Sequence, residues 1–235
     1  VTSTSTSEWG AFAVNSMEVN GGEVNTGDGL EGQTKGLTAK VLVINGGTMV
    51  LDNVNVDERF AADGTKAPVI YCTEISGEYA DGELNILAWN GSNGTVYGNY
   101  YILDDFTIDT DEIVTINDDA VFHVNGYTFT NNGTLRFNMG SSMEGAQPTG
   151  KIEYQTLWDI DGDGTADESD YTREGTEPTH ADPAKEMTET TVYTFAGWDP
   201  TPVAIQTPTQ FKALFTESPR KYTVSLSSGE GYVIH

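Results

Sequence analysis

The chain has 235 residues, enough for one or two domains with a buried core. Its 11 Lys and Arg residues stand against 36 Asp and Glu residues, a formal net charge of −25, which argues against binding to nucleic acids or anionic membranes, since both require clustered positive charge. No run of about 18 apolar residues is present to span a bilayer, and the single cysteine, Cys72, cannot form an internal disulfide.

The two ends of the chain indicate a piece of a longer protein. The sequence begins without Met or a signal peptide, and residues 1–7 are only Val, Thr and Ser. The sequence stops abruptly at His235. We therefore expect an excised fragment whose first residues form a linker or a frayed strand.

From Ala11 to about Met139, short apolar alternations are each stopped by a cluster of Asn, Asp or Gly. Alternation with a period of two residues, bounded by such clusters, predicts β-strands and turns. The predicted strands are Ala11–Val19, Val41–Ile44, Met49–Val56, Leu84–Trp89, Ile113–Ile116, Val121–Val124 and Tyr127–Thr130.

Asn-Gly pairs follow several of these strands, and both residues tolerate positive φ. Such pairs suit a hairpin and a solenoid corner equally well. Irregular repetition of similar units favours the solenoid, for example Val19-Asn-Gly-Gly-Glu-Val24 and Ile44-Asn-Gly-Gly-Thr-Met49. These phrases resemble the rungs of right-handed parallel β-helices in large bacterial surface proteins. We therefore predict an all-β fold with a solenoid over residues 1–150; the alternative is an antiparallel β-sandwich built from the same strands.

The segment Gly140–Gly150 is rich in Gly, Ser and Pro, and we place a domain boundary at its end. Beyond it, Tyr193-Thr-Phe-Ala-Gly-Trp-Asp-Pro200 is followed by the alternating strand Phe211-Lys-Ala-Leu-Phe215. This pattern resembles the Listeria–Bacteroides repeat, also called the internalin-type B-repeat. The resemblance implies a small β-grasp-like module over residues 151–222, with its first strand at Tyr154–Trp158. The first hairpin here is longer and more acidic than is usual in that family.

Within this module, Gly197 permits a tight turn and Trp198 can cover a thin core, with an exposed sugar-stacking surface as the alternative role of Trp198. Residues 223–235 continue the strand that opens at Tyr222 and resemble the start of a further, truncated repeat.

An acidic stretch, Asp159-Ile-Asp-Gly-Asp-Gly-Thr-Ala-Asp-Glu-Ser-Asp170, has the spacing of a calcium-binding loop. It resembles dockerin and EF-hand loops, in which carboxylates and one main-chain carbonyl coordinate the ion. The candidate ligands are Asp159, Asp161, Asp163, the carbonyl of Thr165, Asp167 and Asp170. The competing interpretation is a plain hairpin turn, which we favour because Asp-Gly pairs form tight turns and the following residues cannot make the helix that normally accompanies such a loop.

Several aromatic residues gather among Gly and Asn, as in loops that bind glycans or proteins. They are Tyr79, Trp89, Tyr97, Tyr100 and Tyr101. Burial inside the long segments of a solenoid is the other explanation.

Pairs of carboxylates raise the possibility of glycan cleavage, which uses two acids or an acid cluster with a base. They are Asp104 with Asp105, Asp109 with Asp111, and Asp118 with Asp119. Their positions at predicted strand ends favour solvated corners instead. His123 lies in a predicted strand without another His or Cys nearby, which argues against a metal ligand.

Together these patterns favour a non-catalytic module of an exported bacterial cell-surface protein, located outside the cell on the surface or cell wall. It would act as an adhesin-like or spacer scaffold that contacts a host or bacterial protein or glycan. We expect no nucleic-acid partner and no direct membrane insertion, and Ca²⁺ at the acidic loop is the one candidate cofactor. The alternative is a fragment of a carbohydrate-active β-helix enzyme, a polysaccharide lyase or a glycosidase.

Overall fold

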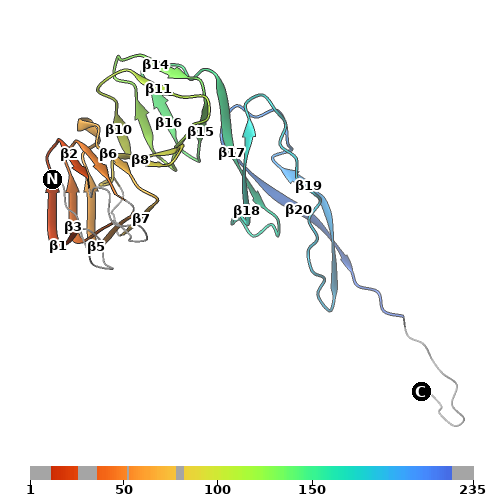
Figure 1. Cartoon of the computed structure of the whole chain (residues 1–235). Helices are drawn as coiled ribbons and strands as arrows, with labels where there is room; N and C mark the ends of the chain where they lie inside the picture. The colour runs from red at the N-terminus through yellow and green to blue at the C-terminus, as the bar shows by residue number, and fades with distance from the viewer. Residues whose placement is uncertain (1–11, 26–35, 52, 78–81, 224–235) are drawn as a thin grey trace, which may run out of the picture. The chain divides into compact units, whose positions relative to one another are not determined.

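A computed structural model describes residues 12–25, 36–51, 53–77 and 82–223 (Figure 1). These residues form an all-β structure with one short 3₁₀ helix, η1 (Gly64–Lys66), and no α-helix. Most of the strands belong to a parallel β-solenoid of about six turns. The parallel solenoid expected from the repeated units is confirmed, and the antiparallel sandwich is wrong.

The first part of the solenoid, which we call the first coil, contains two strands in each turn. One sheet is fully parallel and consists of β1 (Phe12–Val19), β3 (Gly36–Ile44), β5 (Asn53–Ala62) and β7 (Glu74–Gly77). The facing strands are also parallel and begin a longer, shared sheet: β2 (Glu23–Asn25), β4 (Thr48–Val50), β6 (Val69–Tyr71) and β8 (Ile86–Asn90).

The second coil continues the shared sheet and adds two further short sheets. Its strands in the shared sheet are β9 (Asn93–Tyr97), β12 (Ile113–Ile116), β15 (Thr134–Phe137) and β17 (Lys151–Asp159). A second parallel sheet contains β10 (Asn99–Tyr101), β13 (Val121–His123) and β16 (Ser142–Glu144). A third contains β11 (Phe106–Ile108) and β14 (Phe129–Asn131).

Asn-Gly-Gly corners stack on one another in the first coil. The amide of Asn45 donates to the carbonyl of Val19 at 2.7 Å, and the amide of Thr48 donates to that of Gly22 at 2.8 Å. Gly47 has φ +93°, and a Cβ atom there would lie 2.4 Å from the carbonyl oxygen of Gly22. Only glycine allows successive turns to approach so closely at this corner.

The apolar run Met49–Val56 was predicted as one strand, and this is wrong. The structure divides it into β4 and β5, which lie in different sheets. The buried side chain of Leu51 lies between them. A corner that buries its own apolar side chain needs no Asn-Gly signal, so alternation alone did not reveal the bend.

The core changes from one face of the shared sheet to the other at β8. In the first coil the buried row is Met49, Ile70 and Ala88, which are register partners. In the second coil the buried row contains Leu87, its antiparallel partner Val96, and Ile116. Because neighbouring residues of a strand point to opposite faces, Leu87 and Ala88 serve different cores.

This change of face explains the continuous apolar sequence of β8, since a strand covered on both faces need not alternate. Ile86, Leu87, Ala88 and Trp89 are all buried. The chain then reverses through the Asn90-Gly91 turn, where Gly91 has φ +58°, so that β8 and β9 pair antiparallel. Asn-Gly pairs thus serve both as solenoid corners and as a hairpin turn.

The chain divides into two compact units. The first contains the solenoid together with Asp170–Pro178 and Val203–Thr209; the second contains Leu157–Ser169, Thr179–Pro202 and the residues from Gln210 onward. Within the first unit, a hydrogen bond from the amide of Gly175 to the carbonyl of Ile205 joins the two added segments at 2.9 Å.

The second unit contains β19 (Thr191–Asp199) and β20 (Thr209–Pro219), which pair antiparallel, and the loop between β17 and β18 (Glu168–Arg173). Its core is aromatic: the ring of Trp158 lies 4.8 Å from the rings of both Phe211 and Trp198, measured between centroids. Trp198 is half-buried in this cluster. Gly197, expected at a tight turn, lies inside β19 beside a β-bulge with φ +128°.

Candidate functional site

The acidic loop between β17 and β18 is organised around the fully buried carboxylate of Asp159. Its Oδ1 accepts hydrogen bonds from the amides of Gly162 (2.7 Å) and Asp163 (3.0 Å), and its Oδ2 accepts one from Gly164 (2.7 Å). The Nζ atom of Lys212 lies 4.0 Å from Oδ2. Main-chain donors and one lysine therefore satisfy this charge and hold the loop closed.

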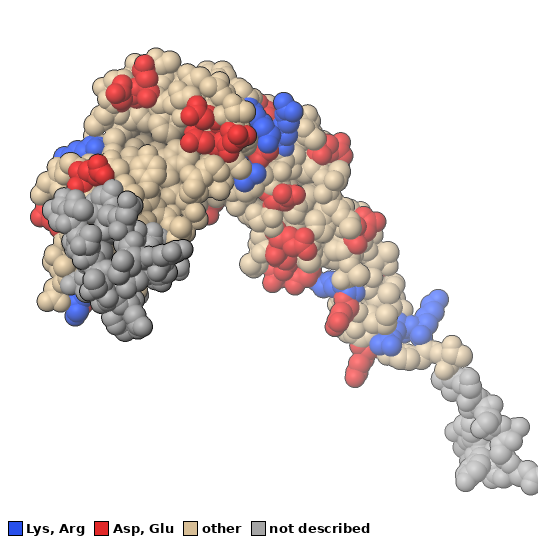
Figure 2. Space-filling model, in the orientation of Figure 1, with Lys and Arg blue, Asp and Glu red and all other residues tan. Residues whose placement is uncertain are grey.

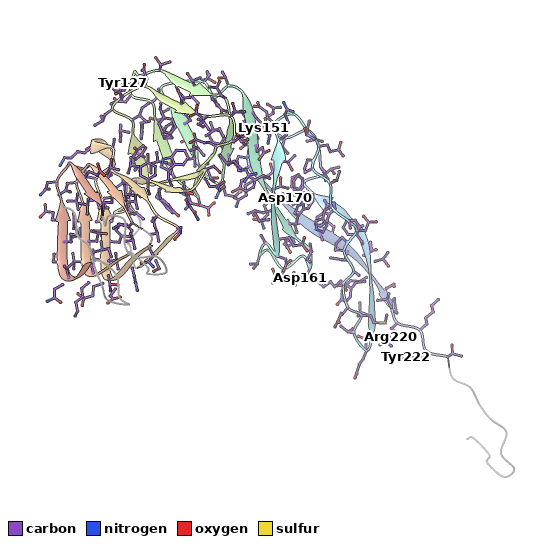
Figure 3. The ribbon with its side chains drawn as sticks, in the orientation of Figure 1. Tyr127, Lys151, Asp161, Asp170, Arg220 and Tyr222 are labelled. Carbon is purple, nitrogen blue, oxygen red and sulfur yellow. The ribbon has the colours of Figure 1, made fainter. Side chains whose placement is uncertain are left out.

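Three of the predicted calcium ligands converge in the structure. Asp159, Asp161 and Asp167 each offer one carboxylate oxygen, and these oxygens lie within 4.8 Å of one another. Asp161 is at the tip of the hairpin (Figure 3). Oxygen donors of this kind suit Ca²⁺, but the ion takes six to eight of them.

Two of the other predicted ligands accept main-chain amides close to them in the sequence, Asp163 in the turn and Asp170 within β18. The Asp163 carboxylate accepts the amide of Thr165, and the Asp170 carboxylate accepts the amide of Tyr171, each at 2.7 Å. The Asp163 contact, made to the amide two residues on, fits the hairpin interpretation of the loop. Calcium binding stays the alternative prediction for this loop.

A groove of about 490 Å³ lies in the first unit, where the outer face of β6 meets the first turn of the second coil. Its floor contains buried side chains of the shared sheet and of the segment that follows β10: Leu87, Trp89, Tyr100 and Ile102. Two large apolar side chains on its walls are exposed, Tyr71 by 45% and Leu103 by 47%. The groove thus presents apolar surface that no described residue covers.

Four carboxylates line the same groove: Asp104, Asp105, Asp109 and Glu112. Asp105 Oδ1 accepts the amide of Thr128 at 2.8 Å, and Glu112 Oε2 accepts the amide of Asp109 at 2.9 Å. One oxygen of each of these two side chains thus fixes a corner, while the charge faces the groove. Burial, with the neighbouring Tyr71, raises the pKa of Tyr100 well above its ordinary value, so that the phenol stays neutral.

The aromatic residues singled out from the sequence are distributed over several places. Trp89 and Tyr100 share the groove, whereas Tyr97 lines a separate pocket of about 280 Å³ beside Cys72 and Thr95. Tyr101 stacks on the imidazole of His123 with ring centroids 3.9 Å apart. Tyr79 lies outside the described residues.

Sequence reasoning missed Tyr71 and Leu103 as lining residues. The signal for Tyr71 was the register, because Tyr71 and Trp89 are partners in the parallel pair β6–β8 and so point to the same face. Leu103 follows β10 in a connecting segment without periodicity. Its exposure could not be inferred without the fold.

The imidazole of His123 interacts with side chains of its own sheet. Its Nδ1 lies 3.1 Å from Glu144 Oε2, and its Nε2 lies 3.5 Å from Asn99 Oδ1. No Cys or second His takes part in this row, so His123 acts here as a packed strand residue. Cys72 is buried in the first coil's core, as its apolar neighbours indicated.

A cluster of charged side chains lies on the outer face of β15 and β17 in the shared sheet. Arg136 Nε donates to Glu153 Oε2 at 2.8 Å, and Lys151 Nζ lies 2.7 Å from Glu153 Oε1. The Arg136 guanidinium lies over the ring of Tyr171, 4.3 Å from its centroid. Burial raises the pKa of Glu153, but the hydrogen bonds from Lys151 and Arg136 outweigh it and lower the pKa.

Comparison with known proteins gives no relative: no family model, curated protein or solved structure matches the chain. The described residues include no helix that is long and apolar enough to cross a membrane. Acidic side chains are spread over the visible surface, with basic ones in a few small groups (Figure 2).

Proposed function

We propose that this chain is a non-catalytic display module of an exported bacterial cell-surface protein, with a host or bacterial protein or glycan as its contact. The observation that carries the proposal is the solenoid itself. Stacked parallel strands set exposed side chains in register, as in the row Thr38, Asn55 and Ser76. Such rows make extended surfaces suited to binding rather than to enclosing a substrate.

Two sequence features add support. The resemblance of residues 151–222 to B-repeats implies a module that occurs in tandem on bacterial surface proteins, and the large negative charge suits an exposed, solvated protein. We also expect the coil to be right-handed, from the resemblance to bacterial β-helices and from the general handedness of parallel crossovers. Residues 224–235, predicted to begin a further repeat, lie outside the described residues.

A carbohydrate-active enzyme is the second candidate function. Asp104, Asp105, Asp109 and Glu112 line one groove, as the acids of a glycosidase do. The described lining contains no Lys, Arg or His, the basic residue that we expect beside the acids of a lyase. The exposed apolar walls fit contact with a partner better than they fit catalysis.

The two functions are separated by measuring binding and turnover on the same preparation. The purified chain is applied to arrays of bacterial and host surface proteins and glycans, and in parallel to a polysaccharide panel. Turnover is read by release of reducing ends and by absorbance of unsaturated products. We expect binding without turnover. Turnover that is lost on Asp104→Asn or Glu112→Gln would overturn the display function in favour of the enzyme.

A further inference from the structure

The groove is bordered by a strand edge that no described strand covers. β11 pairs only with β14 among the described strands, and Phe106 and Thr107 of β11 line the groove. On the β14 side, the amide of Phe106 donates to Thr128 and the carbonyl of Ile108 accepts from Asn132. Because alternate residues of a strand bond to opposite neighbours, the amide and carbonyl of Thr107 point to the open edge. An extended chain can pair there.

Charge at the two ends of this edge is uncompensated. Asp104 and Asp105 precede β11, and Asp109 and Glu112 follow it. Within the described part of the chain none of these four forms an ion pair, whereas Glu58, Glu83 and Glu153, among others, each do. An occupant that carries positive charge would neutralise the groove, and an anionic one would be repelled.

Apolar contact is offered between the two acidic ends. The floor of the groove is buried, and the exposed side chains of Tyr71 and Leu103 form part of its walls. Apolar side chains of an occupant would bury these surfaces, and a lysine or arginine can also lie against the face of a tyrosine ring. Apolar walls, acidic ends and an open strand edge occur together at this one place.

We propose that the groove binds an extended peptide segment of a partner protein, in which Lys or Arg alternates with apolar residues, and that this segment pairs with β11. The inference deepens the proposed display function by naming the class of partner. A protein segment is favoured over a glycan because only a polypeptide can use both the amide and the carbonyl of Thr107 in a strand ladder. The net charge of the groove selects a basic segment.

The test uses the full chain and a synthetic peptide of alternating Lys and Val, blocked at both ends. We expect saturable binding by titration calorimetry that weakens as added salt shortens the Debye length from about 10 Å to about 3 Å. The double variant Asp104→Asn/Asp105→Asn should weaken binding about tenfold, because two exposed charge pairs are lost. Asparagine keeps an Oδ1 acceptor for the amides of Asp105 and Thr128, so these corners should persist.

Matched controls separate the site from general attraction to an acidic protein. The variant Asp182→Asn/Glu186→Gln removes the same charge from the second unit and should bind as the wild type does. A peptide of alternating Glu and Val should not bind. A Lys–Val peptide with N-methyl groups on every amide, which can donate from neither edge of the strand, should lose most of its affinity.

Several results would overturn the inference: no binding of the Lys–Val peptide, equal loss in the control variant, or indifference to N-methylation. So would self-association of the chain that the Asp104/Asp105 variant abolishes, because the occupant would then be a second copy. Each of these outcomes leaves the display function standing. That function fails separately, by turnover on the polysaccharide panel.

Discussion

Leu87 and Ala88 are consecutive residues of one strand, yet their side chains pack in the cores of different coils. β8 is the strand at which the buried face of the shared sheet changes. Each residue therefore reports on a different part of the solenoid.

Replacing Leu87 should destabilise the second coil. Leu87→Ala removes a side chain that is 1% exposed, and such truncations cost about 2–5 kcal/mol. The measurement is the free energy of unfolding from urea denaturation. Leu103→Ala, at an exposed site, is the control and should change stability by no more than about 0.5 kcal/mol. An equal effect of both changes would contradict the packing described for β8.

The ion pairs of Glu153 with Arg136 and Lys151 predict that the free energy of unfolding falls at acidic pH. The pKa of Glu153 lies below its ordinary value of 4.5 in the folded chain. Its stabilising contribution is therefore complete above that ordinary value and is lost as the pH falls through the lowered pKa. Glu153→Gln should reduce stability near neutral pH and flatten the acid-side decline, measured by urea midpoints at a series of pH values. An unchanged decline would assign the acid sensitivity to other carboxylates.

Truncation of Asp159 should disorder the acidic loop. Asp159→Ala leaves the amides of Gly162, Asp163 and Gly164 without their acceptor, and a buried unsatisfied donor costs about 1–3 kcal/mol. We expect faster amide hydrogen exchange across residues 160–166 and a lower thermal midpoint. Asp161→Ala, on an exposed residue that accepts one amide, should have a smaller effect. The reverse order would show that Asp159 does not organise the loop.

The same loop should fold without calcium, because main-chain amides and Lys212 already satisfy its buried carboxylate. Thermal midpoints measured in excess chelator and in excess Ca²⁺ should coincide. A midpoint that rises with Ca²⁺, as mass action on the folded state requires, and that no longer rises in Asp167→Asn, would instead establish a calcium site at Asp159, Asp161 and Asp167.

Much of the solenoid could be predicted because its signals are local. Alternation and Asn-Gly clusters located β1, β8, β12 and β13 to within two residues, and the last four residues of β3. The corner at Leu51 could not be predicted, since a bend that buries an apolar residue looks like a continuing strand. The groove was also beyond prediction: Tyr71, Trp89 and Asp104 meet only through the sheet register and the reversal after β8.

The change of buried face at β8 also determines how the number of turns in each coil can change. Since each coil packs its own interior on its own side of the shared sheet, a turn inserted or deleted in one coil leaves the interior of the other untouched. The hairpin after β8 thus separates two lengths that can vary independently while the hydrogen-bonded sheet remains unbroken.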